Sequence, residues 1–156
     1  MGNAPALDPT VIEGLRLLTT PGEPDVLTEV LRMFLMEAPK RMDRLRNAHQ
    51  AGDIFAAFDG SEMVGAIVTK RRDRTLELAL IGVSPTRQKQ GIASWMIGRM
   101  EEVARGRGLA TLSLNTAEIM EDRVRLYGRH GFVVVRRGPP EHGQDAHVRA
   151  YMEKTL

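Results

Sequence analysis

The chain has 156 residues, of which 42% are apolar and 27% are charged, and these proportions are ordinary for one folded domain. It has no cysteine, which excludes a disulfide, a thiol nucleophile and a cysteine zinc ligand. The histidines show no spacing typical of a metal site, so we expect no metal; they are His49, His130, His142 and His147.

No apolar run approaches the length that spans a bilayer, and the N-terminal segment lacks the basic start and apolar core of a secretion signal. We therefore predict a cytoplasmic protein that has no membrane partner. The formal net charge is +2, and basic side chains outnumber acidic ones only beyond residue 60. That part of the chain suits a phosphorylated cofactor, whereas the scarcity of aromatic side chains for stacking disfavours a nucleic acid.

Two helical patterns dominate the first third of the chain. Between residues 24 and 38 apolar side chains recur on one helical face, and Pro39 breaks the pattern. A more polar helix is predicted over residues 39–51, because Gly52 can adopt the left-handed conformation that ends a helix. Residues 10–19 are ambiguous, since their apolar spacing fits either a helix or a short strand.

The pattern changes to β-structure at Asp53. Residues 54–58 and 63–68 flank a turn-forming Asp-Gly pair and predict a β-hairpin, and residues 76–83 predict a third strand. A polar loop follows, and then a helix is predicted over residues 91–107, where apolar side chains share one face and glycines end the pattern.

Short strands and one helix make up the rest of the chain. They are a strand over 111–114, a helix over 118–130, a strand over 132–135 and a last strand near 146–152. This order predicts a mixed α/β sheet in a single domain covering residues 1–156, with residues 7–52 as a mainly helical N-terminal part and residues 53–156 as the remaining core.

The polar loop after the third strand has the features of an anion site. A strand runs through this loop directly into a helix, whose first N–H groups and positive dipole end attract phosphate. Gly91 and Ala93 are small enough for a phosphate to approach the backbone, and Arg87 and Lys89 add positive charge. The loop has neither the Gly-Lys-Ser/Thr of a Walker motif nor the glycine pattern of a dinucleotide site.

This loop resembles the coenzyme-binding motif of the GNAT superfamily of N-acetyltransferases, which has the pattern Gln/Arg-x-x-Gly-x-Gly/Ala. Gln88, Gly91 and Ala93 occupy its three defined positions. A second family feature, a Leu-Tyr pair followed after three residues by Gly-Phe, is present at residues 126–132. Both motifs and the order of elements make residues 53–156 similar to the acetyl-CoA-binding core of that family.

The resemblance implies the mixed α/β fold of the acyl-CoA N-acyltransferases. It also implies an enzyme that transfers an acetyl group from acetyl-CoA, as co-substrate, to a primary amine by direct attack. The acceptor would be a small molecule or a peptide. Such a reaction needs a neutral amine, a polarised thioester carbonyl and a proton for the leaving thiolate.

Two residues match catalytic positions of the family. Tyr127 matches the usual general acid, a phenol that protonates the departing sulfur; the simpler interpretation is an aromatic side chain that packs in the core. Glu77 aligns with the strand glutamate that acts as the base in histone-modifying members, and it shares a strand face with Ala79 and Ile81. The alternative for Glu77 is a solvated side chain near the start of a strand.

The resemblance also implies a set of coenzyme-binding residues. The backbone of Ile81, Gly82 and Val83 would contact the pantetheine arm and the thioester oxygen. Asn115 either donates to the pantetheine or caps the next helix together with Glu118. Tyr127 completes the set with the residues of the loop and of the first helical turn: Gln88, Lys89, Gln90, Gly91, Ile92, Ala93 and Ser94.

Two stretches depart from the family pattern. Lys89 and Gln90 stand where a glycine and a basic residue are usual, and Met120 and Arg123 replace an asparagine and an alanine that often precede the Leu-Tyr pair. These changes leave a backbone phosphate cradle in place and alter the side-chain contacts to the coenzyme.

A second resemblance concerns residues 7–53. This segment is similar to the first half of a histidine phosphotransfer domain, but the phosphorylatable His-x-Leu-Lys-Gly motif that should follow is missing. The alternative to an active enzyme is therefore a signalling or dimerisation module fused to an acetyltransferase-like core with little or no catalysis. Because an incomplete helical bundle exposes an apolar face, we expect a homodimer through the N-terminal helices.

Overall fold

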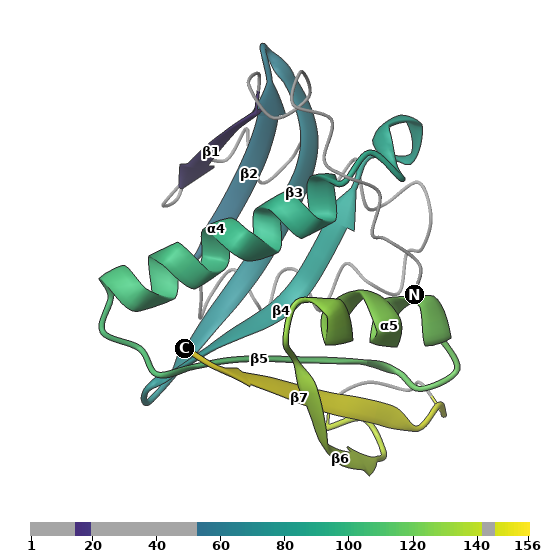
Figure 1. The fold of residues 1–156 in the computed structure, drawn as a ribbon. Coiled ribbons are helices and arrows are strands. Elements are labelled where there is room, and N and C mark those ends of the chain that lie inside the picture. Colours follow the sequence, from purple (N-terminus) through teal and green to yellow (C-terminus); the bar gives the residue numbers. More distant parts are fainter. Residues whose placement is uncertain (1–14, 20–52, 142–145) are drawn as a thin grey trace. The chain divides into compact units, whose positions relative to one another are not determined.

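The computed structural model describes residues 15–19, 53–141 and 146–156 (Figure 1). The helices expected over 24–51, the homodimer that would use them and the phosphotransfer-like segment lie outside the described residues, apart from one short strand. The described chain falls into two compact units, which are treated separately: the first contains residues up to Lys70 and Ala79–Met100, and the second contains Arg71–Leu78 and Glu101–Leu156. Among the described residues no helix is long and apolar enough to cross a membrane.

The first unit contains an antiparallel sheet. Strand β1 (Leu15–Thr19) pairs with β2 (Ile54–Asp59), and β2 pairs with β3 (Glu62–Arg72), with β4 (Thr75–Val83) next in the order. The ambiguous segment of the sequence is therefore a strand over residues 15–19. The predicted hairpin and third strand are confirmed, and the hairpin carries a register shift between Ala57 and Phe58.

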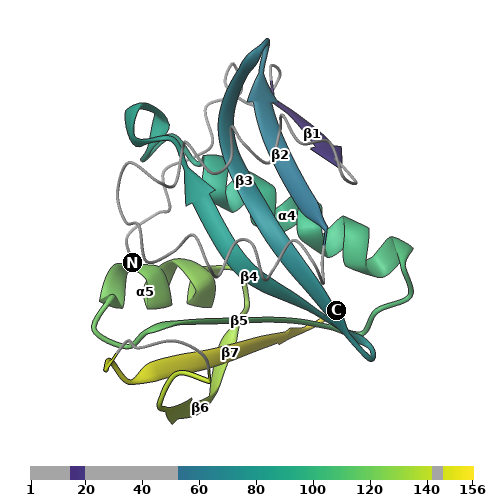
Figure 2. The ribbon, with the colours of Figure 1, turned by 180° about the vertical axis from the view of Figure 1, so that it is seen from behind.

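The core of this unit lies between the sheet and the first half of helix α4 (Ile92–Gly106). The helix crosses one face of β2 and β3 in Figure 1 and lies behind them in Figure 2. Met96 of the helix packs against Gly65 of β3: a Cβ at Gly65 would stand 2.9 Å from Met96 Cε and 2.9 Å from the carbonyl oxygen of Gly82. A glycine at this position therefore allows the helix and two strands to approach closely.

The second unit contains a mixed sheet. The start of β4 pairs in parallel with β5 (Thr111–Ala117), and β5 and β6 (Val133–Gly138) both pair antiparallel with β7 (Arg149–Thr155). The strand order is β4-β5-β7-β6. The α/β fold with a mixed sheet is thus confirmed.

Element boundaries in this unit differ from the prediction, and one of the two alternatives for Asn115 is excluded. Helix α5 (Glu121–Arg129) begins three residues later than expected, because β5 continues to Ala117 and the Glu118 amide donates to the carbonyl of Val148. Asn115 lies inside β5 opposite Tyr151 and therefore does not cap the helix. The last strand begins at residue 149 rather than 146 and ends at residue 155.

Candidate active site

The loop that ends β4 has a backbone suited to binding an anion. The Ser84 amide donates to the carbonyl of Val64 at 2.9 Å, and a short 3-10 helix, η2 (Pro85–Arg87), follows. Gly91 has a φ of +81° and its carbonyl accepts from the Trp95 amide at 2.9 Å, which starts the helical ladder of α4. The amides of the first turn point out of the N-terminal end of the helix, where an anion is stabilised.

Lys89 has an unusual conformation within this loop. Its φ is +62°, in the left-handed region that glycine adopts without strain and lysine does not. The sequence already showed that lysine stands where the related family usually has glycine. The loop therefore keeps the backbone path that a glycine would take, although the side chain makes that path less favourable.

Arg87 does not carry free positive charge toward the loop, contrary to the expectation from the sequence. Its Nη2 lies 2.7 Å from Asp59 Oδ2 and its Nη1 lies 2.8 Å from Glu62 Oε2. The hydrogen bond to Asp59 raises the pKa of the guanidinium above its ordinary value, so the group stays charged. Its charge is balanced by two carboxylates of the β2–β3 hairpin, which leaves the exposed Lys89 as the cation of this loop without such a partner among the described residues.

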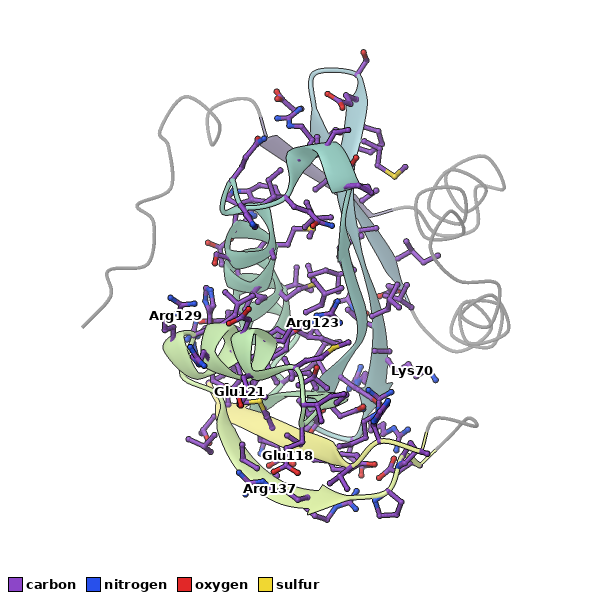
Figure 3. The ribbon with its side chains drawn as sticks, turned by 90° about the vertical axis from the view of Figure 1, so that its right-hand side faces the viewer. Lys70, Glu118, Glu121, Arg123, Arg129 and Arg137 are labelled. Atoms are coloured by element: carbon purple, nitrogen blue, oxygen red, sulfur yellow. The ribbon has the colours of Figure 1, made fainter. Side chains whose placement is uncertain are left out.

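Tyr127 occupies the second unit and is largely buried on α5. Its side chain is 8% exposed and packs edge to face on Phe132, with ring centroids 6.2 Å apart. Burial raises the pKa of the phenol, and the positive charge of Arg123 partly opposes this shift. Figure 3 labels Arg123, Glu121 and Arg129 on the same helix. The phenol therefore stays protonated at neutral pH and can serve as a proton donor.

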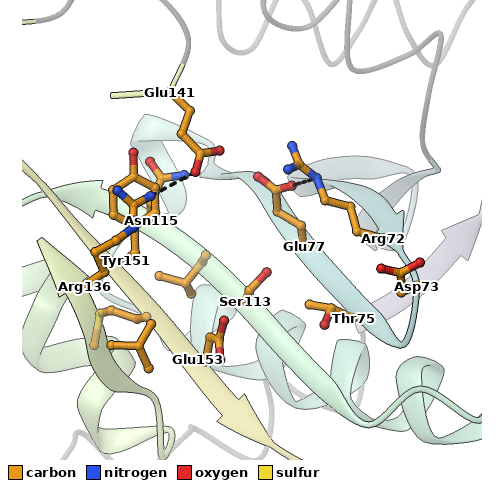
Figure 4. A pocket seen from close by; sticks show the side chains of 13 residues that line it. Arg72, Asp73, Thr75, Glu77, Ser113, Asn115, Arg136, Glu141, Tyr151 and Glu153 are labelled. Atoms are coloured by element: carbon orange, nitrogen blue, oxygen red, sulfur yellow. Dashed lines mark hydrogen bonds and ion pairs between the residues drawn. The ribbon is translucent and has the colours of Figure 1, made fainter. Parts of the chain in front are cut away.

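A cavity of about 360 Å³ opens in the second unit beside Glu77 (Figure 4). The Glu77 side chain is 19% exposed, and its Oε2 lies 3.1 Å from Nε of Arg72 in an ion pair. That oxygen is buried and accepts no hydrogen bond. A buried carboxylate oxygen with unused acceptor capacity can take a proton or a hydrogen bond from a ligand.

The other wall of the cavity comes from β5, β6 and β7. Asn115 is exposed there, opposite Tyr151, and Arg136 lies over the Tyr151 ring at 3.7 Å from its centroid. Arg136 also pairs with Glu141 at 2.9 Å, and the Tyr151 hydroxyl donates to the carbonyl of Pro139 at 2.7 Å. The cavity is thus lined by the aromatic ring of Tyr151 and by several carboxylates.

The structure brings together some of the predicted site residues. Glu77 and Asn115 line the same cavity, whereas Tyr127 is not among its lining residues. The predicted loop and the C-terminal end of β4 belong to the first unit. Sequence reasoning missed the cavity residues Arg72, Asp73, Arg136, Glu141, Tyr151 and Glu153, because only strand pairing places them beside Glu77.

Two further features bear on the chemistry. Among the described residues no group of three or more histidine, cysteine, aspartate or glutamate side chains could hold a metal ion. His130 is half-buried, and burial is the main cause that lowers its pKa.

The model of the acetyltransferase (GNAT) family matches residues 24–132. The chain belongs to this family. The enzyme predicted from the sequence is therefore confirmed as a GNAT N-acetyltransferase. The match includes residues 24–52, for which the sequence left a signalling alternative open, and none of these comparisons supports that alternative.

Individual relatives agree with this family. The chain is 26% identical to an uncharacterised N-acetyltransferase, YvbK, of Bacillus subtilis (strain 168). The match extends over 105 residues, which are 67% of either chain. A Bacillus subtilis acetyltransferase solved in complex with CoA has a TM-score of 0.76, with 21% identity and coverage of 91% of this chain and 99% of that one. The ribosomal-protein-S18-alanine N-acetyltransferase of Escherichia coli has a TM-score of 0.77, 16% identity and coverage of 90% and 94%.

Proposed function

We propose that this GNAT enzyme transfers an acetyl group from acetyl-CoA to a primary amine by direct attack. The loop from Gln88 to Gly91 is the observation that supports acetyl-CoA as the donor, because its left-handed residues turn the backbone into the first turn of α4. Such a turn presents amide groups to a pyrophosphate. The related Bacillus subtilis acetyltransferase that was solved with CoA supports the same donor.

In the proposed reaction the neutral amine attacks the thioester carbonyl carbon, and the new C–N bond forms as the C–S bond breaks. Glu77 first accepts a proton from the ammonium form of the acceptor, directly or through one water, which gives the neutral amine, and Arg72 holds the Glu77 carboxylate in place. Tyr127 gives its proton to the departing thiolate. Its raised pKa keeps that proton available at neutral pH.

The cavity beside Glu77 is the proposed acceptor site. Carboxylates outnumber guanidinium groups among its described lining residues, and Arg72 and Arg136 are each paired with one of those carboxylates. Asp73 and Glu153 then remain to attract a cationic amine. The acceptor is a small molecule or the end of a peptide, since about 360 Å³ holds only a small group.

A screen of amines with acetyl-CoA tests this function. The panel pairs each diamine with the amino acid of equal chain length, and release of the free CoA thiol reports turnover. We expect amine-dependent thiol release that is faster with the diamine of each pair. The absence of release with every amine would contradict the proposed reaction, and faster turnover of the amino acids would contradict the acidic acceptor site.

A further inference from the structure

Arg87 connects the loop to the end of the β2–β3 hairpin. Each of its three guanidinium nitrogens has one partner: Nη2 contacts Asp59 at 2.7 Å, Nη1 contacts Glu62 at 2.8 Å, and Nε donates to Gln90 Oε1 at 3.1 Å. Asp59 and Glu62 face each other in the strand register as the last residue of β2 and the first of β3. The Arg87 side chain is only 17% exposed.

Because of these contacts, the Arg87 guanidinium lies between the two carboxylates and the Gln90 side chain of the loop that begins at Gln88. Two negative charges so close to a pyrophosphate site would repel the ligand unless a cation balances them. Arg87 supplies that cation. Its planar fork also fixes the direction of the Gln90 side chain within the loop.

We propose that Arg87 is a positioning residue for the acetyl donor, and this inference rests on the proposed function. It neutralises Asp59 and Glu62, so that the pyrophosphate of acetyl-CoA binds to the loop from Gln88 to Gly91 without contacting Arg87. A direct contact between Arg87 and phosphate would require the loss of both ion pairs.

The first test compares two acetyl donors in the Arg87→Gln variant. S-acetylpantetheine carries the same thioester but lacks the pyrophosphate and the 3′-phosphoadenosine beyond it, so it is the control donor without negative charge. We expect the dissociation constant and KM for acetyl-CoA to rise about 10-fold at low salt, with a smaller rise at high salt because the repulsion is screened. The ratio of kcat/KM for acetyl-CoA to kcat/KM for S-acetylpantetheine should fall by the same factor. An unchanged ratio would overturn the inference.

The second test removes the carboxylates. Adding Asp59→Asn and Glu62→Gln to Arg87→Gln should restore most of the lost affinity, because no repulsion remains to be balanced. The same two substitutions with Arg87 intact should bind acetyl-CoA at least as tightly as the wild type, which keeps the inference testable if Arg87→Gln does not fold. Weaker binding in that pair variant would overturn it.

The two proposals fail in different ways. A wild-type protein without saturable acetyl-CoA binding would contradict the proposed function and, with it, the role of Arg87. Wild-type binding together with equal affinity in Arg87→Gln would overturn the role of Arg87 alone.

Discussion

The loop of the first unit and the cavity of the second unit are built by different means. In the loop the proposed binding groups are backbone amides, and the half-buried Arg87 is balanced by carboxylates from a neighbouring hairpin. The cavity is lined by side chains from five strands, β3 to β7, and Glu77 has a buried oxygen that accepts no hydrogen bond. The two regions should therefore tolerate substitutions differently. The loop depends on backbone conformation, whereas the cavity depends on the identity of single side chains.

The largest expected effect concerns the loop. Gly91→Glu forces a side chain onto a φ of +81° and places a negative charge in the proposed phosphate site. We expect the affinity for acetyl-CoA to fall by more than about 10²-fold in a calorimetric titration. Gly98→Ala is the matched control, because an added Cβ at this α4 position meets nothing within 4 Å. Undiminished binding in Gly91→Glu would show that the coenzyme does not bind at this loop.

A substitution on α5 should separate chemistry from binding. Tyr127→Phe keeps the packing against Phe132 and removes the phenolic proton. We expect kcat to fall on the order of 10²-fold while the dissociation constant for acetyl-CoA stays the same. Stopped-flow or steady-state thiol release measures the first quantity. Equal turnover would make Tyr127 a core residue only.

Glu77→Gln should give a smaller effect that depends on pH. The variant keeps the shape of the side chain, so fold and coenzyme binding survive, while the amine loses its proton acceptor. We expect kcat to fall about 10-fold at neutral pH and to recover partly at high pH, where free amine is abundant. A uniform loss at every pH would show that Glu77 positions the acceptor instead.

Lys89→Gly tests the strain in the loop. Because lysine at a φ of +62° is strained and glycine is not, the variant should gain up to about 1 kcal/mol of stability, measured from its denaturant midpoint. Asp73→Gly, at a φ of 50° in the β3–β4 turn, is the control, and it should gain less because aspartate tolerates this region better. A loss of stability in Lys89→Gly would contradict the strain.

The smallest expected effect concerns His130. Its pKa is lowered in the folded protein, first by burial and then by the charge of Lys154. The unfolded chain therefore binds more protons, and this contribution to stability is present above the ordinary histidine pKa and is lost as the pH falls toward the folded value. His130→Gln should flatten that acid side of the stability profile. If the variant has the same dependence of stability on pH as the wild type, groups other than His130 cause that dependence.

The contrast between the two regions also explains how much of the protein could be predicted. The loop was found from the sequence because its chemistry needs only small residues after a strand, as at Gly91 and Ala93. The strands were found for the same local reason. The balance of Arg87 by Asp59 and Glu62 could not be predicted, since it joins residues more than 20 positions apart through a hairpin end.

The cavity was only half predictable. Alternation along a strand places Ser113 and Asn115 on one face, but the register that sets Asn115 opposite Tyr151 depends on pairing with a strand at the end of the chain. The start of α5 was wrong for a similar reason, because a hydrogen bond to Val148 extends the preceding strand region. In both cases pairing between strands distant in sequence set the structure, and the local sequence pattern did not indicate it.

The proposed role of the loop is to bind the pyrophosphate of acetyl-CoA. Calorimetric titration of the wild-type protein with acetyl-CoA, compared with S-acetylpantetheine under the same conditions, tests it directly. We expect saturable binding of one acetyl-CoA per chain and an affinity at least about 10²-fold higher than for the truncated donor, which lacks the pyrophosphate and the 3′-phosphoadenosine. Equal affinity for the two donors, or no saturable binding of acetyl-CoA, would contradict it.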